Sequence, residues 1–129
     1  MIGMGPMAKR ILLIEDAPQV AGILVAKLAR EGHEVAWKRN RAEALAALEQ
    51  PFDLILLSTD LDARNAWEVL SELKAGTRTP IVMLLETEEA SLDPEALRQG
   101  ACGVILKPFK PTVVARKVRE WLEAFPAAS

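Results

Sequence analysis

A short apolar run in the middle of the chain, from Leu54 to Leu57, constrains the fold more than any other feature. It ends abruptly in polar residues that begin with Ser58. An apolar run of this length between polar turn formers is typical of a strand that is buried on both faces of a parallel sheet. In open α/β sheets, ligands and chemistry gather at the carboxyl ends of such strands. Much of the functional question therefore concerns the side chain of Ser58.

Similar apolar runs recur along the chain and alternate with amphipathic stretches. The predicted strands cover residues 10–14, 33–37, 54–57, 81–85 and 103–106. Apolar residues spaced three and four positions apart predict five helices, over about 17–32, 41–50, 66–76, 93–100 and 114–125. Strands and helices that alternate in this way imply parallel strands joined by right-handed crossovers. We expect one doubly wound α/β domain.

The length of the chain sets the number of domains. With 129 residues it is long enough for one core and too short for two ordinary domains. We expect a loose tail over residues 1–8, the domain over 9–125 and a frayed end over 126–129. No apolar stretch approaches the length of a membrane span, and the start lacks the apolar core of a secretory signal. A lone cysteine, Cys102, cannot form an intramolecular disulfide, and we expect its thiol to be packed in the core. Together, these features lead us to expect a cytoplasmic protein.

Charge argues against a nucleic-acid partner. The formal net charge is −2, whereas nucleic-acid binding normally needs a basic face. We interpret the basic side chains as solvated faces; they are Lys38, Arg39, Arg41, Arg116, Lys117 and Arg119. The only histidine, His33, is predicted to lie solvated in a turn.

Polar residues follow four of the predicted strands and are expected to meet at one edge of the sheet. They are Glu15 and Asp16 after the first strand, Ser58 to Asp62 after the third, Glu86 after the fourth and Lys107 after the fifth. An acidic pair beside a third carboxylate suits Mg²⁺, and a lysine can hold a phosphoryl oxygen. Without a phosphoryl group, Lys107 is expected to pair with Asp16. The first loop lacks the glycines of a dinucleotide site, and its carboxylates would repel a bound phosphate.

These motifs, in this order, resemble the receiver domain of two-component response regulators, which is CheY-like. The matching pieces are ILLIED at 11–16, GHEV at 32–35, EAL at 43–45, DLILL at 53–57, WEVL at 67–70, TPIVML at 79–84, GA at 100–101 and KPF at 107–109. The resemblance covers about residues 9–125. It implies a flavodoxin-like five-stranded parallel sheet in the order 2-1-3-4-5, with helices on both faces, and a role in a signalling phosphorelay. It also implies a cis peptide bond before Pro108.

Among the positions that depart from the pattern of the family, three concern its phosphorylation and switching. The phosphoacceptor aspartate of the family falls on Ser58, which cannot form an acyl phosphate. Its hydroxyl-bearing switch residue falls on Leu85, and its switching aromatic falls on Val104. The phosphoacceptor, the hydroxyl-bearing switch residue and the switching aromatic are all replaced, so we interpret the chain as a pseudo-receiver, a receiver domain that is not phosphorylated in the usual way.

Three functions remain open from sequence. The first is an interaction module that is not an enzyme, requires no cofactor and binds a histidine kinase or a regulator-type effector, or a second copy of itself. It would use the face formed by the fourth helix, fifth strand and fifth helix, and weak Mg²⁺ binding at Glu15, Asp16 and Asp60 is compatible with it. The second is a phosphoaccepting receiver that uses Asp60. The third is a Mg²⁺-dependent phosphohydrolase, since Asp60-Leu61-Asp62 is similar to the haloacid dehalogenase nucleophile motif; no further acidic pair after Lys107 supports it.

Overall fold

The computed structural model describes residues 9–58, 66–86 and 93–125. The predictions made for the two tails and for Asp60 and Asp62 lie outside these ranges. Among the described residues, no helix combines the length and the apolar character that a membrane span requires.

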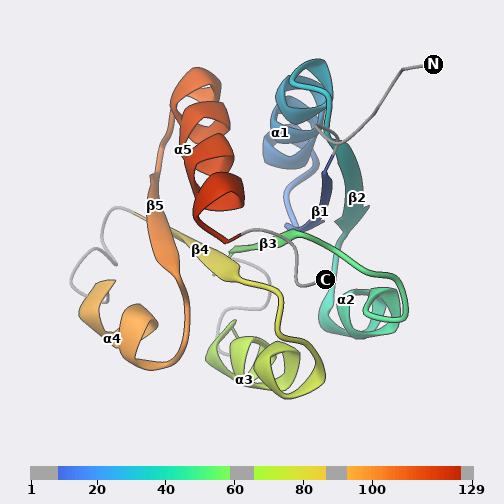
Figure 1. Ribbon diagram of the computed structural model, residues 1–129, viewed down its shortest axis with the longest axis vertical. Helices are drawn as coiled ribbons and strands as arrows, with labels where there is room; N and C mark the ends of the chain where they lie inside the picture. The colour runs from blue at the N-terminus through green and yellow to red at the C-terminus, as the bar shows by residue number, and fades with distance from the viewer. Residues whose placement is uncertain (1–8, 59–65, 87–92, 126–129) are drawn as a thin grey trace.

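Five strands form one parallel sheet in the order β2-β1-β3-β4-β5 (Figure 1). The strands are β1 (Arg10–Ile14), β2 (Glu34–Lys38), β3 (Leu54–Ser58), β4 (Ile81–Glu86) and β5 (Gly103–Lys107). They alternate with the helices α1 (Pro18–Arg30), α2 (Arg41–Ala47), α3 (Ala66–Gly76), α4 (Asp93–Arg98) and α5 (Pro111–Ala124). The doubly wound fold and its strand order are as predicted.

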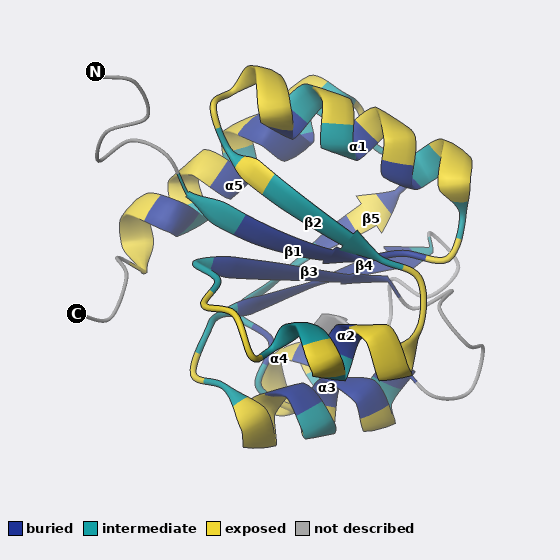
Figure 2. Cartoon of the chain, turned by 90° about the vertical axis from the view of Figure 1, so that its right-hand side faces the viewer, coloured by how far each residue is buried: buried dark blue, intermediate teal, exposed yellow. Residues whose placement is uncertain are grey.

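The helices form two layers, one on each face of the sheet (Figure 2). Helices α1 and α5 lie together on one face, and α2, α3 and α4 lie on the other. Because side chains alternate along a strand, each central strand contributes to both cores. In β3, Leu54 and Leu56 belong to the core under α1 and α5, while Ile55 and Leu57 belong to the core over α2, α3 and α4. All five residues of β3 are buried, which explains why its sequence is a continuous apolar run.

Local sequence signals account for several of the element ends. Proline occupies the first turn of both α1 and α5, where its missing N–H costs no hydrogen bond. The Asn40 side chain accepts a hydrogen bond from the backbone N–H of Glu43 and so caps α2. Gly32 follows α1 with φ of +93°, the left-handed conformation predicted for it. The peptide bond between Lys107 and Pro108 is cis, also as predicted.

Candidate functional site

The alternation of side chains brings three polar residues from three strands to one place. Glu15 follows Ile11 and Leu13 at intervals of two, Ser58 follows Leu54 and Leu56, and Lys107 follows Ile105. The apolar members of these series all belong to the core under α1 and α5. Glu15, Ser58 and Lys107 therefore lie at the carboxyl ends of their strands and on the same face of the sheet.

The ammonium group of Lys107 joins these residues. Its Nζ lies 2.8 Å from Ser58 Oγ and donates a hydrogen bond to it, and it lies 3.1 Å from Glu15 Oε1. Ser58 and Glu15 are fully buried, and Lys107 is 6% exposed. A buried ammonium needs a compensating anion and hydrogen-bond acceptors, and the strand ends supply both.

Neighbouring groups hold Glu15 in this position. Its second oxygen, Oε2, accepts a hydrogen bond from the backbone N–H of Ala17 at 3.0 Å. Its backbone carbonyl accepts one from Trp37 Nε1 at 2.7 Å. Both carboxylate oxygens of Glu15 are thus engaged within the protein. The roles of Ala17 and Trp37 were not predicted, since neither residue type marks a polar site in sequence.

Glu86 is the second carboxylate near the ammonium. Its Oε2 lies 3.7 Å from Lys107 Nζ, and β4 and β5 place the two residues directly opposite each other. Asp16, in contrast, is exposed to solvent. The prediction that Lys107 pairs with Asp16 is therefore wrong: the side chain of Asp16 is at a position of the opposite parity to Glu15 and lies in solvent, so the buried lysine pairs with Glu15.

The two positions of the expected switch lie away from this polar group. Leu85 is fully buried in the core over α2, α3 and α4, and Val104 packs against the same core. An aliphatic side chain offers no hydrogen bond to a phosphoryl oxygen, and Val104 has no ring that can turn inward.

The described residues bring few carboxylates together at this edge of the sheet. Within the described ranges, no three His, Cys, Asp or Glu side chains lie close enough together to hold a metal ion. The hard cation needs several oxygen ligands, and both oxygens of Glu15 are already bound to the ammonium and to a backbone N–H.

Cys102 and His33 lie outside this site, and both are partly buried. Cys102 is half-buried and packs against the core under α1 and α5, and burial raises the pKa of its thiol. His33 is half-buried, and its Nδ1 is buried without a hydrogen-bond partner among the described residues, so the ring is less solvated than predicted.

The fold and the polar group at the carboxyl edge define a class: α/β domains of five parallel strands with an acidic residue, a hydroxyl and a lysine at the ends of β1, β3 and β5. Residues 11–119 match the response regulator receiver domain. This chain belongs to the family of response regulator receiver domains.

Individual relatives agree with this assignment. The chain is 35% identical over 117 residues to the DNA-binding response regulator MtrA of Mycolicibacterium smegmatis, which covers 90% of this chain and 51% of MtrA. It is similar to the crystal structure of the NtrX receiver domain from Brucella abortus, with a TM-score of 0.82 and 28% identity over 88% of this chain and 98% of that one. The receiver domain of the sensor histidine kinase PA1611 from Pseudomonas aeruginosa, solved with a magnesium ion in its active site cleft, gives a TM-score of 0.78 and 28% identity over 90% and 98%. The chain spans about half the length of the curated relatives it matches.

Proposed function

We propose that this receiver domain signals through protein contacts and accepts no phosphoryl group at the usual position. The observation that supports this most is the direct hydrogen bond between Lys107 Nζ and Ser58 Oγ, together with the ion pair to Glu15. The residue at the acceptor position is a buried hydroxyl, and the lysine that would hold a phosphoryl oxygen is bound to protein groups.

The chemistry of Ser58 supports the same proposal. A serine hydroxyl forms a phosphate ester and never the acyl phosphate that an aspartate forms, and it needs a base to become a nucleophile. The Lys107 ammonium, which donates a hydrogen bond to this hydroxyl, has three donors and no acceptor. An ammonium that donates to the hydroxyl cannot also remove its proton.

We further propose that the domain requires no cofactor, is not an enzyme and binds Mg²⁺ weakly. The magnesium ion of the PA1611 receiver shows what a related site holds. In this chain Glu15 and Asp16 would be its described ligands, and Mg²⁺ would have to displace the Lys107 ammonium from Glu15. Occupancy by Mg²⁺ therefore competes with an internal ion pair.

The partner surface that we propose is the face formed by α4, β5 and α5. β5 is an edge strand of the sheet. Leu97 on α4 is 52% exposed, and Leu106 on β5 is 39% exposed. Contiguous exposed apolar surface marks protein contacts, and these two leucines contribute apolar area to this face. A histidine kinase, a regulator-type effector or a second copy of the chain fits this surface, whereas the net charge of −2 gives no attraction to DNA.

The variant Ser58→Asp tests the proposal. A third carboxylate should raise Mg²⁺ affinity by on the order of tenfold, because charge count sets affinity for hard cations. It should not restore switching, since Leu85 and Val104 remain. We expect the variant to keep its oligomeric state in light scattering when Mg²⁺ and a small-molecule phosphodonor are added, as the unmodified chain does. Full donor-dependent dimerisation of this single variant would show that the other two positions are dispensable and would overturn the proposal.

A further inference from the structure

The strand β2 is an edge strand of the sheet, and among the described residues it pairs only with β1. The backbone N–H of Glu34 and the backbone carbonyl of Lys38 form hydrogen bonds of 2.8 and 3.1 Å with residues that flank β1. In a parallel strand the N–H and C=O of one residue point to the same side, and the side alternates along the strand. The backbone groups of Val35 and Trp37 therefore point away from β1, toward the open side of β2.

Figure 2 looks at this open side. β2 is the strand nearest to the viewer, with α1 above it and α2 below it. Glu34 is exposed and the other four residues of the strand are half-buried. An edge strand with outward backbone groups is a template for another strand, and charged residues normally prevent such pairing. The two charges of β2 are Glu34 and Lys38, one at each end of the strand.

The sequence of β2 is complementary to itself when two copies run antiparallel. With Ala36 opposite Ala36 of a second copy, Glu34 lies opposite Lys38 of that copy, and Val35 lies opposite Trp37. The arrangement has a two-fold axis, so each of these pairs occurs twice. Opposite charges and pairs of an aromatic with a β-branched side chain stabilise antiparallel strands when they lie directly across from each other.

The direction of the backbone groups fits the same register. In an antiparallel pair, opposed residues alternate between those that exchange two backbone hydrogen bonds and those that exchange none. With the two Ala36 residues as a pair that exchanges none, Val35 and Trp37 exchange them, and these are the residues whose N–H and C=O point outward. Glu34 and Lys38 then form the closer type of pair, which brings their side chains together. Charge and backbone geometry thus select one register independently.

The side chains that this register uses are accessible or already ordered. The side chain of Glu34 is 63% exposed, and its ion pair with Arg10 at 3.4 Å is a surface pair that contributes little. Among the described residues, Lys38 forms no ion pair. The indole of Trp37 is held by its hydrogen bond to the segment after β1 and by Arg39, which lies 5.7 Å from the ring centroid.

We propose that β2 pairs with β2 of a second copy, antiparallel and centred on Ala36, so that two five-stranded sheets join across a two-fold axis. The contact is small, so we expect a weak dimer with a dissociation constant on the order of 100 µM. The inference goes beyond the proposed function, because it concerns the other edge strand and leaves the face formed by α4, β5 and α5 open to a partner.

Sedimentation of the full chain between about 10 µM and 1 mM, with charge variants of β2, tests the inference. Lys38→Glu sets two carboxylates against each other at both ends of the contact, and Glu34→Lys does the same with two ammonium groups. Each variant alone should associate at least about tenfold more weakly than the unmodified chain. Arg116→Glu, at an exposed position of α5, reverses a charge elsewhere and should leave association unchanged.

An equimolar mixture of the two β2 variants provides the decisive arm. In a mixed dimer every lysine again lies opposite a glutamate, so association should return to within about threefold of the unmodified chain. Because each chain keeps its own substitution, restored association requires contact between positions 34 and 38 of different chains. A mixture that associates no better than either variant alone would overturn the inference.

Hydrogen exchange of the unmodified chain tests the same contact without a substitution. The amide protons of Val35 and Trp37 should exchange more slowly as protein concentration rises, because they become bonded to the second copy. A chain that stays monomeric up to about 1 mM would overturn the inference. So would a dimer in which concentration protects the amides of β5 and leaves those of β2 unchanged.

Discussion

Lys107 is a buried ammonium that contacts groups at the carboxyl ends of three other strands. Glu15 directly follows β1, Ser58 ends β3 and Glu86 ends β4. Burying an ion pair costs desolvation, so the pair itself stabilises the fold little, but removing one partner leaves the other buried and unpaired. The individual residues of this group should therefore show large and strongly coupled effects on stability.

A double-mutant cycle measures this coupling. Lys107→Met should lower the free energy of unfolding by about 3–5 kcal/mol, because it leaves the fully buried Glu15 without its cation. Adding Glu15→Gln should recover part of the loss, because it removes the uncompensated charge. Urea denaturation of the two single variants and the double variant gives the interaction energy. If the losses in free energy of unfolding of the two single variants simply add in the double variant, Lys107 and Glu15 are not coupled in the fold.

His33 should make stability depend on pH. Burial lowers the pKa of its imidazole, and the Arg119 and Lys9 cations act in the same direction, while the Glu31 and Asp53 carboxylates oppose them. The unfolded chain therefore binds a proton more readily than the folded one, so this contribution is fully present above the ordinary pKa near 6.5 and is lost as pH falls below it.

The variant His33→Gln isolates that contribution. Between pH 7.5 and 5.5 the unmodified chain should lose more free energy of unfolding than His33→Gln does. The difference should stay below about 1.4 kcal/mol per pH unit, the limit for one proton. Parallel pH profiles of the two proteins would show that the histidine is solvated in both states.

At the scale of elements, the packing of α5 on β5 depends on one glycine. A Cβ atom at Gly103 would lie 2.3 Å from Trp121 Cζ2, so the indole ring of α5 occupies the space that any other side chain at this position would need. Trp121 packs against the core under α1 and α5. This contact joins the edge strand of the proposed partner surface to the helix beside it.

Gly103→Ala should lower the free energy of unfolding by about 1–3 kcal/mol, since the indole is rigid and must move. Combined with Trp121→Leu, the alanine should cost little more than Trp121→Leu alone. Thermal unfolding of the two single variants and the double variant checks this. An alanine that costs the same in both backgrounds would show that the indole does not restrict position 103.

The elements themselves follow from sequence because their signals are local. The apolar run of β3, the proline that begins α1 and the apolar stripe of α5 predicted strand and helix positions that the structure confirms. The predicted second helix extended to Gln50, whereas α2 ends at Ala47, because backbone hydrogen bonds of the turn type close residues 48–50. The contact between Gly103 and Trp121 joins residues far apart in sequence, and neither shows a local pattern that predicts it.

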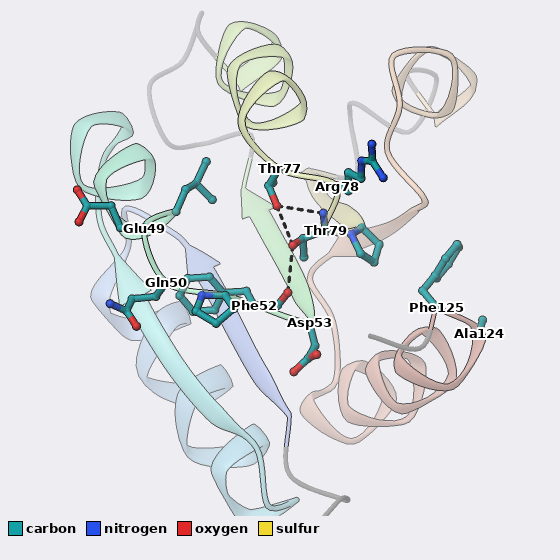
Figure 3. Close-up of a pocket in the computed structure, with 12 residues that line it drawn as sticks. Glu49, Gln50, Phe52, Asp53, Thr77, Arg78, Thr79, Ala124 and Phe125 are labelled. Atoms are coloured by element: carbon teal, nitrogen blue, oxygen red, sulfur yellow. Dashed lines mark hydrogen bonds between the residues drawn. The ribbon is translucent and has the colours of Figure 1, made fainter. Parts of the chain in front are cut away.

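At the scale of the whole molecule, the carboxyl edge of the sheet carries the polar group of Lys107 and the amino edge carries a groove, and sequence predicts only the first. The carboxyl-edge group was predictable, because parallel strands bring their carboxyl ends to one edge and the sequence marks them with Glu15, Ser58 and Lys107. The ion-pair partner of Lys107 was not predicted correctly, because it depends on whether Glu15 or Asp16 faces the core. The groove at the amino edge (Figure 3) was not predicted either, since helix ends and loop residues form it only when the chain is folded.

The proposed function requires that no phosphoryl group is transferred to this domain. Intact-mass spectrometry after incubation with Mg²⁺ and a small-molecule phosphodonor tests that claim most directly, with Ser58→Asp as the matched variant and Asp60→Asn as the control for an unconventional acceptor. We predict that the mass of the unmodified chain does not change. A stoichiometric, alkali-labile adduct on the unmodified chain would mean an acyl phosphate on a carboxylate, and its loss in Asp60→Asn would identify that carboxylate and contradict the proposal.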